Sequence, residues 1–265
     1  MKYNKLGIVA DQSESSQECK KHLMEMYNLV DLQAESRSPA SSKVDALVAI
    51  GGDGFMLHTL HNHIKDGLPV YGMNKGTMGF LLNEFSMKNL DERVNEAADS
   101  KIHPLRMICE CENGEKIEAL AINEVSLLRT TGQAAKISIN VDNTNYLREM
   151  ICDGVLVSTP AGSSAYNYSN GGMILPIKSN LLPLTPISPF RPRRWRGALL
   201  PNNANIEFEV QRYWKRPVKA VADNFEVQNV IKVNVFLDES HTIHLLFDRG
   251  HSLEERIMRE QFEVC

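Results

Sequence analysis

The sequence predicts a two-part protein: an α/β domain with a parallel sheet, followed by an all-β, sandwich-like domain. In residues 1–100, short apolar runs alternate with amphipathic helical patterns, as in a parallel sheet covered by helices. From about residue 101, short apolar runs follow one another with turn signals between them. We therefore place the domains at residues 1–100 and 101–247. We also expect a C-terminal helix within residues 248–265 that packs back on the first domain.

Composition narrows the classes of function. The 265 residues include 29 Lys and Arg against 33 Asp and Glu, a net charge of −4, which argues against a general nucleic-acid binder. No apolar run approaches the roughly 20 residues of a membrane span, and the N-terminus lacks a signal-peptide pattern. The five cysteines form no CxxC pair and are typical of reduced thiols. These features predict a cytoplasmic protein without membrane or nucleic-acid partners.

Each part has a definite order of expected elements. In the first domain we expect strands at residues 6–10, 45–50 and 70–73, and helices at 15–27, 55–63 and 86–98, the last capped by Ser86. In the second we expect strands at 105–111, 116–128, 136–141, 154–158, 206–210, 218–222, 230–236 and 242–247. A helical segment at 162–170 interrupts them. The Pro-rich apolar stretch at 173–190 suits a subunit interface better than a solvated loop.

The chemistry centres on Gly51-Gly52-Asp53-Gly54, between a predicted buried strand and a predicted helix. Glycines allow close approach of the backbone to phosphates, and the N–H groups of a helix start face an anion. A carboxylate in such a turn repels phosphate unless it has a task. Asp53 could accept a proton from an attacking hydroxyl, or hold magnesium against the phosphates. The sequence has no Walker A motif, so a kinase built on this turn is not of the P-loop type.

Further motifs extend this pattern. Gly51-Gly52-Asp53-Gly54 resembles a signature of NAD kinases, of lipid kinases of the diacylglycerol and sphingosine type, and of phosphofructokinases. Asn123-Glu124, and residues 153–172 with the sequence DGVLVSTPAGSSAYNYSNGG, resemble the NAD kinase family in order and spacing. The resemblance covers most of the chain and is to the bacterial type of the family.

The resemblance implies which residues act. Asp53 is the catalytic base, and Gly51, Gly52 and Gly54 hold the donor phosphates. The implied contacts to NAD are Asp53, Gly54, Asn123, Glu124, Asp153, Ala161, Ser164, Ala165, Tyr166, Asn167, Ser169 and Asn224. The family more often has Thr where Ser164 stands, and Gly or His where Asn224 stands; Asn224 can adopt the left-handed turn conformation of glycine.

Residue chemistry alone leaves several of these sites open. The amide of Asn123 can bind an adenine edge and the carboxylate of Glu124 can bind ribose hydroxyls, but both could lie on an exposed strand edge. Asp153 could be a simple turn residue. A serine nucleophile within residues 161–165 is disfavoured, because the stretch is not a nucleophile elbow.

A dense basic run, Phe190-Arg191-Pro192-Arg193-Arg194-Trp195-Arg196, is not explained by these motifs. It could bind a flexible phosphate donor such as inorganic polyphosphate, or RNA through the interleaved Trp195. We favour a solvated loop that pairs with acids of a neighbouring subunit.

The resemblance thus implies an ATP-dependent NAD kinase, which phosphorylates the 2′-hydroxyl of the adenosine ribose of NAD to give NADP. ATP would act with Mg²⁺ or another divalent metal, with no metal site made by protein side chains alone. Polyphosphate is a second candidate donor, and the family is commonly dimeric or tetrameric. The alternatives are a lipid kinase of the diacylglycerol kinase type and a non-catalytic dinucleotide sensor.

Overall fold

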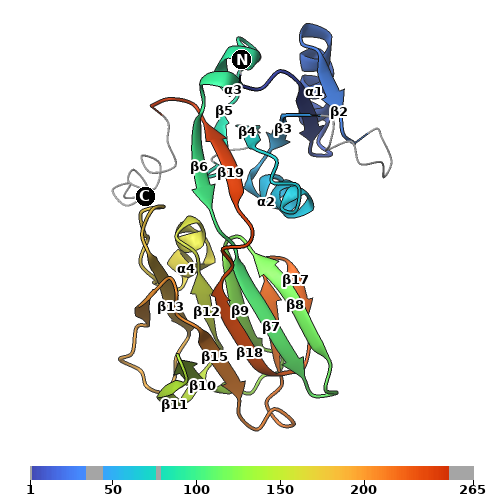
Figure 1. Ribbon diagram of the computed structural model, residues 1–265. Coiled ribbons are helices and arrows are strands. Elements are labelled where there is room, and N and C mark those ends of the chain that lie inside the picture. Colours follow the sequence, from blue (N-terminus) through green and yellow to red (C-terminus); the bar gives the residue numbers. More distant parts are fainter. Residues whose placement is uncertain (1, 34–43, 76–78, 251–265) are drawn as a thin grey trace. The chain divides into compact units, whose positions relative to one another are not determined.

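The structure is a computed structural model that describes residues 2–33, 44–75 and 79–250. The chain divides into two compact units, Met1–Ile102 with His241–Cys265, and His103–Ser240. The first unit is an α/β fold and the second is an antiparallel β sandwich, which confirms the predicted fold class. Figure 1 shows both units.

The first unit is built on one mainly parallel sheet. Its strands are β1 (Leu6–Ala10), β2 (Leu29–Asp31), β3 (Ala46–Gly51), β4 (Val70–Asn74), β5 (Asn83–Glu84), β6 (Ala98–Ile102) and β19 (Ile243–Phe247). Their order is β2-β1-β3-β4-β19-β6, with β5 also paired to β4. Only β6 runs antiparallel to its neighbour among the described pairs.

Local sequence explains the central strand and the flanking helices. Every residue of β3 is buried, as its continuous apolar run predicts for a parallel strand. Helix α1 (Glu14–Met26) begins after Ser13, whose hydroxyl accepts a hydrogen bond from the N–H of Ser16. Helix α2 (Asp53–His63) follows β3 after the single residue Gly52. The carboxyl end of β3 therefore leads directly into the start of a helix.

Two predictions for this unit are wrong. The helix expected at residues 86–98 is the shorter α3 (Leu90–Glu96), and it is preceded by Asn89 with φ +54°, not by Ser86. Ser86 instead accepts a hydrogen bond from the N–H of Lys88, 3.2 Å away, in a turn. The strand expected at 242–247 and assigned by sequence to the second domain is β19 (Ile243–Phe247) of the first sheet. An apolar strand late in the chain does not reveal which sheet it joins.

The second unit consists of two six-stranded antiparallel sheets. One contains β11 (Thr144–Cys152), β10 (Ala135–Val141), β15 (Ile206–Val210), β18 (Val230–Leu237), β7 (Leu105–Cys111) and β8 (Lys116–Ala121), in that order. The other contains β14 (Ala198–Pro201), β13 (Leu181–Ile187), β12 (Gly154–Ser158), β9 (Glu124–Arg129), β16 (Val218–Ala222) and β17 (Phe225–Val227). Buried residues of both sheets, such as Phe208 and Leu127, form one core.

The structure changes the interpretation of two stretches. The single strand expected at 116–128 is two strands in different sheets, β8 and β9, because the chain crosses between the sheets at Ile122 and Asn123. The stretch at 173–190 contains β13, in which all residues but Leu181 are buried within the unit. Its prolines, Pro183 and Pro186, argue against a central strand by composition, and this strand was therefore missed.

Other expectations fall partly outside the described residues. The predicted C-terminal helix lies almost wholly in 251–265, which the structure does not describe. Four of the five cysteines are described, and all four are free and buried. Burial raises the pKa of the Cys109 and Cys152 thiols to about 12. None of the described helices has the length and apolar character needed to cross a membrane.

Candidate active site

Asp53 is the first residue of α2, at the carboxyl end of the buried strand β3. Its two carboxylate oxygens accept hydrogen bonds from the backbone N–H groups of Phe80, at 2.8 Å, and Leu81, at 3.0 Å. These two donors stabilise the ionised carboxylate and fix its orientation. The sequence singled out Asp53 but gave no sign that residues 80 and 81 hold it.

The glycines around Asp53 have different reasons to be glycine. A Cβ on Gly51 would come within 2.9 Å of both Asp11 and Phe55, so the packing of the protein itself requires this glycine. Among the described residues, a Cβ on Gly52 or Gly54 would meet no atom within 4 Å, and neither residue has a positive φ. Nothing in the described fold requires glycine at these two positions. The open space in front of them leaves room for a ligand to approach the backbone.

Asn123 and Glu124 lie where the chain crosses from β8 to β9. The carboxylate of Asp223, in the turn between β16 and β17, accepts hydrogen bonds from three consecutive backbone N–H groups, those of Ile122 at 2.6 Å, Asn123 at 3.0 Å and Glu124 at 3.1 Å. The N–H of Asp223 in turn donates to the carbonyl of Glu124. Asp223 therefore sets the position of the Asn123-Glu124 pair. Sequence reasoning identified the turn but not this role.

Glu124 is a buried acid close to a second acid. Burial first, and the charge of Asp223 second, raise the pKa of Glu124 from 4.5 to about 8. The Oε2 atom of Glu124 is buried and has no hydrogen-bond partner among the described residues. A buried acceptor without a partner costs about 1–3 kcal/mol, so this atom is a candidate to bind a donor from a ligand.

This pKa predicts how stability depends on pH. Because the folded-state pKa of Glu124 lies above its unfolded value, the folded chain binds the extra proton between pH 4.5 and about 8. The free energy of unfolding should therefore decrease as pH rises through this range, by up to about 1.4 kcal/mol per pH unit from this group. Urea unfolding of wild type and Glu124→Gln isolates the contribution, with exposed Glu112→Gln as control. An equal slope in all three proteins would contradict the assignment.

The segment after β12 combines packing residues with exposed ones. It forms a 3-10 turn, Ala161–Ser164, and the short helix α4 (Tyr166–Ser169), which contacts β12 (Figure 1). A Cβ on Gly162 would lie 2.2 Å from the carbonyl oxygen of Asn123, so Gly162 lets this segment pack directly on the Asn123 backbone.

Asn167 has an internal role. It is fully buried, its Nδ2 donates to the carbonyls of Ser163 and Met173, and its Oδ1 accepts from the hydroxyl of Thr185 at 2.7 Å. Its side chain therefore holds the segment together instead of facing a ligand, which differs from the direct contact that the resemblance implied. Ala161 is also buried. The other candidates of this segment are at least partly exposed: Ser164, Ala165, Tyr166 and Ser169.

Asp153 lies apart from Glu124. In the pairing of β9 with β12, Glu124 lies opposite Ser158, and Arg129, at the other end of β9, pairs its guanidinium with Asp153 at 2.5 Å. Five residues of strand separate these ends, about 16 Å at 3.3 Å per residue. The structure thus brings Asn123, Glu124 and the 161–169 segment together, but not Asp153. Asn224 is exposed beside Asp223, and Asp223, not Asn224, has the left-handed φ of +53°.

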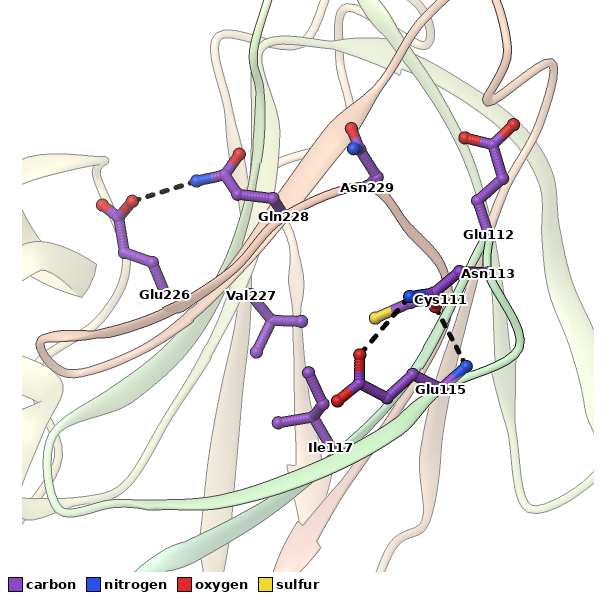
Figure 2. A pocket seen from close by; sticks show the side chains of 9 residues that line it. All are labelled: Cys111, Glu112, Asn113, Glu115, Ile117, Glu226, Val227, Gln228 and Asn229. Carbon is purple, nitrogen blue, oxygen red and sulfur yellow. Dashed lines mark hydrogen bonds between the residues drawn. The ribbon is translucent and has the colours of Figure 1, made fainter.

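A cavity of about 470 Å³ in the second unit has a lining that includes none of these residues. Figure 2 shows its lining, which comes from the β7–β8 hairpin turn and from residues 226–229. Three lining residues are acids, namely Glu112, Glu115 and Glu226. Their charge disfavours a phosphate-bearing ligand, and none of the candidate residues lines the cavity.

Comparison with known proteins shows similarity to one family along nearly the whole chain. Residues 4–102 match the model of the ATP-NAD kinase N-terminal domain, and residues 122–229 match that of the ATP-NAD kinase C-terminal domain. The chain is 48% identical to the NAD kinase of Rhizobium meliloti over 261 residues, 98% of each chain. It is 46% identical to the NAD kinase of Zymomonas mobilis over 268 residues, 100% of each.

Solved structures show the same fold. Yeast NADH kinase complexed with NADH matches with a TM-score of 0.81 and 22% identity, over 99% of this chain and 88% of the yeast chain. An NAD kinase from Archaeoglobus fulgidus in complex with ATP matches with a TM-score of 0.76 and 21% identity, over 99% and 100%. With both domain models matched in order and curated relatives aligned end to end, the chain belongs to the NAD kinase family.

Proposed function

We propose that this protein transfers the terminal phosphoryl group of ATP to the 2′-hydroxyl of the adenosine ribose of NAD, and that Asp53 accepts the proton of that hydroxyl. The observation that carries the proposal is the position of Asp53, whose carboxylate oxygens are oriented by two backbone N–H groups, next to two glycines with no described atom in front of them. In phosphoryl transfer the transition state is loose, so positioning and charge stabilisation matter more than base strength. A well-oriented carboxylate suffices.

We assign binding of the ATP phosphates to Gly51, Gly52 and Gly54. The open space beside Gly52 and Gly54 supports close approach of the ATP phosphates to the backbone at the start of α2, where the helix dipole favours an anion. Gly52 and Gly54 therefore differ from Gly51, where the packing against Asp11 and Phe55 already accounts for the glycine.

Magnesium fits this arrangement as a companion of ATP. Within the described residues no group of three or more His, Cys, Asp or Glu side chains could hold a metal ion. Mg²⁺ in kinases is held largely by substrate phosphates and waters, so the ion would arrive with the ATP phosphates at the start of α2 and leave Asp53 free to act as the base. When bound, the ion neutralises charge that develops on the transferred phosphoryl group. Asp53, the Gly52 backbone and the start of α2 orient the reactants around it.

The NAD side rests on Asn123 and Glu124. The unpartnered Oε2 of Glu124 supports a hydrogen bond to a ribose hydroxyl, and the amide of Asn123 can bind the adenine edge. Ser164, Ala165, Tyr166 and Ser169 offer exposed groups on the adjoining segment, where Tyr166 can stack on a planar ring. Ala161 and Asn167 are buried within this segment and stabilise it without facing the ligand.

A single substitution tests the NAD side. Measured above pH 8, where the Glu124 carboxylate is ionised, Glu124→Ala should weaken NAD binding by about 1.5–3 kcal/mol, the value of hydrogen bonds to a charged group, and leave ATP binding nearly unchanged. Titration calorimetry with each ligand measures both effects. Glu112→Ala, which removes an exposed carboxylate of the same unit, should change neither. Equal losses for NAD and ATP in the Glu124 variant would contradict the assignment.

We also propose that the active enzyme is a homodimer or homotetramer in which Asp153 of one subunit contacts the NAD that is bound to a second subunit. The distance of Asp153 from Glu124 along β9 supports this arrangement. Activity per subunit should then fall on dilution, because a shared site depends on protomer concentration. Mixing inactive Asp53→Asn and Asp153→Ala chains under exchange conditions should restore part of the activity. No recovery, with exchange demonstrated, would mean that each chain builds its own site.

A further inference from the structure

Asp11 follows β1 at the point where the connections of the first sheet change direction. From β1 the chain passes through α1 to β2 on one side, and from β3 it passes through α2 to β4 on the other. The two strands β1 and β3 are adjacent and parallel, with Ala10 opposite Ile50. In open parallel sheets, ligands bind outside the carboxyl ends of the strands at such a switch point. The residues that follow β1 therefore share a ligand-binding edge with the glycine turn that follows β3.

The carboxylate of Asp11 is directed toward this glycine turn. The N–H of Asp11 donates to the carbonyl of Ile50 at 2.9 Å, which continues the pairing of β1 with β3. The Oδ2 atom of Asp11 lies 2.9 Å from the position that a Cβ would take at Gly51, and a ring atom of Phe55, in the first turn of α2, lies equally close to that position. Asp11 is therefore beside the start of α2, where we place the ATP phosphates.

Asp11 carries its negative charge without a positive partner. Its Oδ1 atom accepts hydrogen bonds from the N–H and the hydroxyl of Ser13, at 3.0 and 2.5 Å. Partial burial acts to raise the pKa of Asp11, but the hydrogen bonds that it accepts, first those from Ser13, outweigh burial and lower the pKa below its usual value. Among the described residues no positively charged side chain pairs with it. Such a charge beside a phosphate site repels the phosphates unless a cation lies between them.

We propose that Asp11 binds the Mg²⁺ ion that accompanies the ATP phosphates. Mg²⁺ is bound in kinases through one or two carboxylates together with substrate phosphates and waters, so one carboxylate at this edge of the sheet is enough. The hydrogen bonds from Ser13 fix Oδ1, and Oδ2 is the oxygen directed toward the glycine turn. The inference rests on the proposed function, because it takes ATP as the donor.

The test measures ATP binding to the full chain by titration calorimetry, with Mg²⁺ and without any divalent metal, in the absence of NAD. Asp11→Asn keeps an oxygen for the hydrogen bonds from Ser13 and removes the charge. With Mg²⁺ present, the variant should bind ATP about tenfold more weakly or worse, as is typical when a group that supports a metal site is lost. Without metal, it should bind ATP at least as tightly as wild type, because a repulsive charge is gone. A damaged fold would weaken binding in both conditions.

Two further variants serve as controls. Asp45→Asn removes a carboxylate of the same unit that also accepts two backbone N–H bonds, which lower its pKa, but that precedes β3 instead of following a strand. Ser13→Ala removes the hydroxyl that donates to Asp11 and caps α1, and it keeps the charge of Asp11. Both variants should show the wild-type ratio between the ATP affinities with and without Mg²⁺.

Three results would overturn the inference and leave the proposed kinase reaction intact. An equal loss of ATP affinity in Asp11→Asn with and without Mg²⁺ would mean that Asp11 only holds the turn before α1. An unchanged dependence on Mg²⁺ in this variant would place the ion elsewhere. The same change in Asp45→Asn would reduce the effect to net charge. Failure of the wild type to bind ATP in either condition would instead overturn the proposed donor, and this inference with it.

Discussion

Asp53→Asn should reduce turnover by at least about 10²–10⁴-fold, the usual contribution of a general base, while ATP and NAD still bind. In the wild type each oxygen of the Asp53 carboxylate accepts one bond, from the backbone N–H of Phe80 or of Leu81. The amide side chain of the variant has only one oxygen, so its NH₂ group would face one of these N–H groups and leave it without an acceptor. An unsatisfied N–H costs about 1–3 kcal/mol, so a loss of stability should accompany the loss of activity. Steady-state kinetics and urea unfolding measure the two effects separately.

Asp45→Asn provides the matched control for Asp53. One oxygen of Asp45 accepts hydrogen bonds from the backbone N–H groups of Asn4 and Lys5, at 2.8 and 2.9 Å, just before the start of β3. The variant should therefore lose some stability and keep its turnover. If Asp53→Asn retained near-normal turnover, Asp53 would not be the base. If both variants lost turnover equally, the effect would come from stability.

Asp223→Ala should cause the largest loss of stability among single substitutions in the second unit's candidate site. It removes the acceptor of three backbone N–H groups, and at about 1 kcal/mol for each the free energy of unfolding should fall by about 3 kcal/mol or more. NAD binding should weaken as well, because Asp223 positions Asn123 and Glu124. Urea unfolding and NAD titration calorimetry check the two expectations.

Asp142→Ala separates this effect from backbone strain. Asp142 also lies in a turn with a left-handed φ, +49° against +53° for Asp223, but it accepts only one described backbone N–H bond, from Asn205. Alanine meets similar strain at both positions. A loss in Asp223→Ala no greater than that in Asp142→Ala would contradict the bridging role.

The sequence predicted the elements whose signals are local. The apolar run of β3 followed by glycines and an acid was enough to place Asp53 at the start of a helix, since each feature lies within ten residues. The alternation of strands and helices likewise predicted the parallel sheet. Conversely, the break at Ile122 and Asn123 was missed, because an apolar run shows no sign of a crossing between two sheets.

The missed parts of the site depend on contacts between distant residues. Asp223 bonds residues about 100 positions earlier, and Asp53 bonds residues 27 and 28 positions later. One sequence without a structure contains no pattern that pairs them. The same holds for Asn167, whose amide could equally have faced a ligand until its bonds to Ser163, Met173 and Thr185 showed that it faces inward.

The most direct measurement is NADP formation by the purified chain with ATP, Mg²⁺ and NAD, followed with an NADP-specific dehydrogenase and by ³¹P NMR of the product. The account predicts one NADP for each ATP consumed, with the new phosphate monoester on the 2′-oxygen, and a rate of product formation at least about 10²-fold lower in Asp53→Asn. Binding of NAD without NADP formation would indicate a dinucleotide sensor. Phosphorylation of diacylglycerol in place of NAD would indicate a lipid kinase, and either result would contradict the proposed reaction.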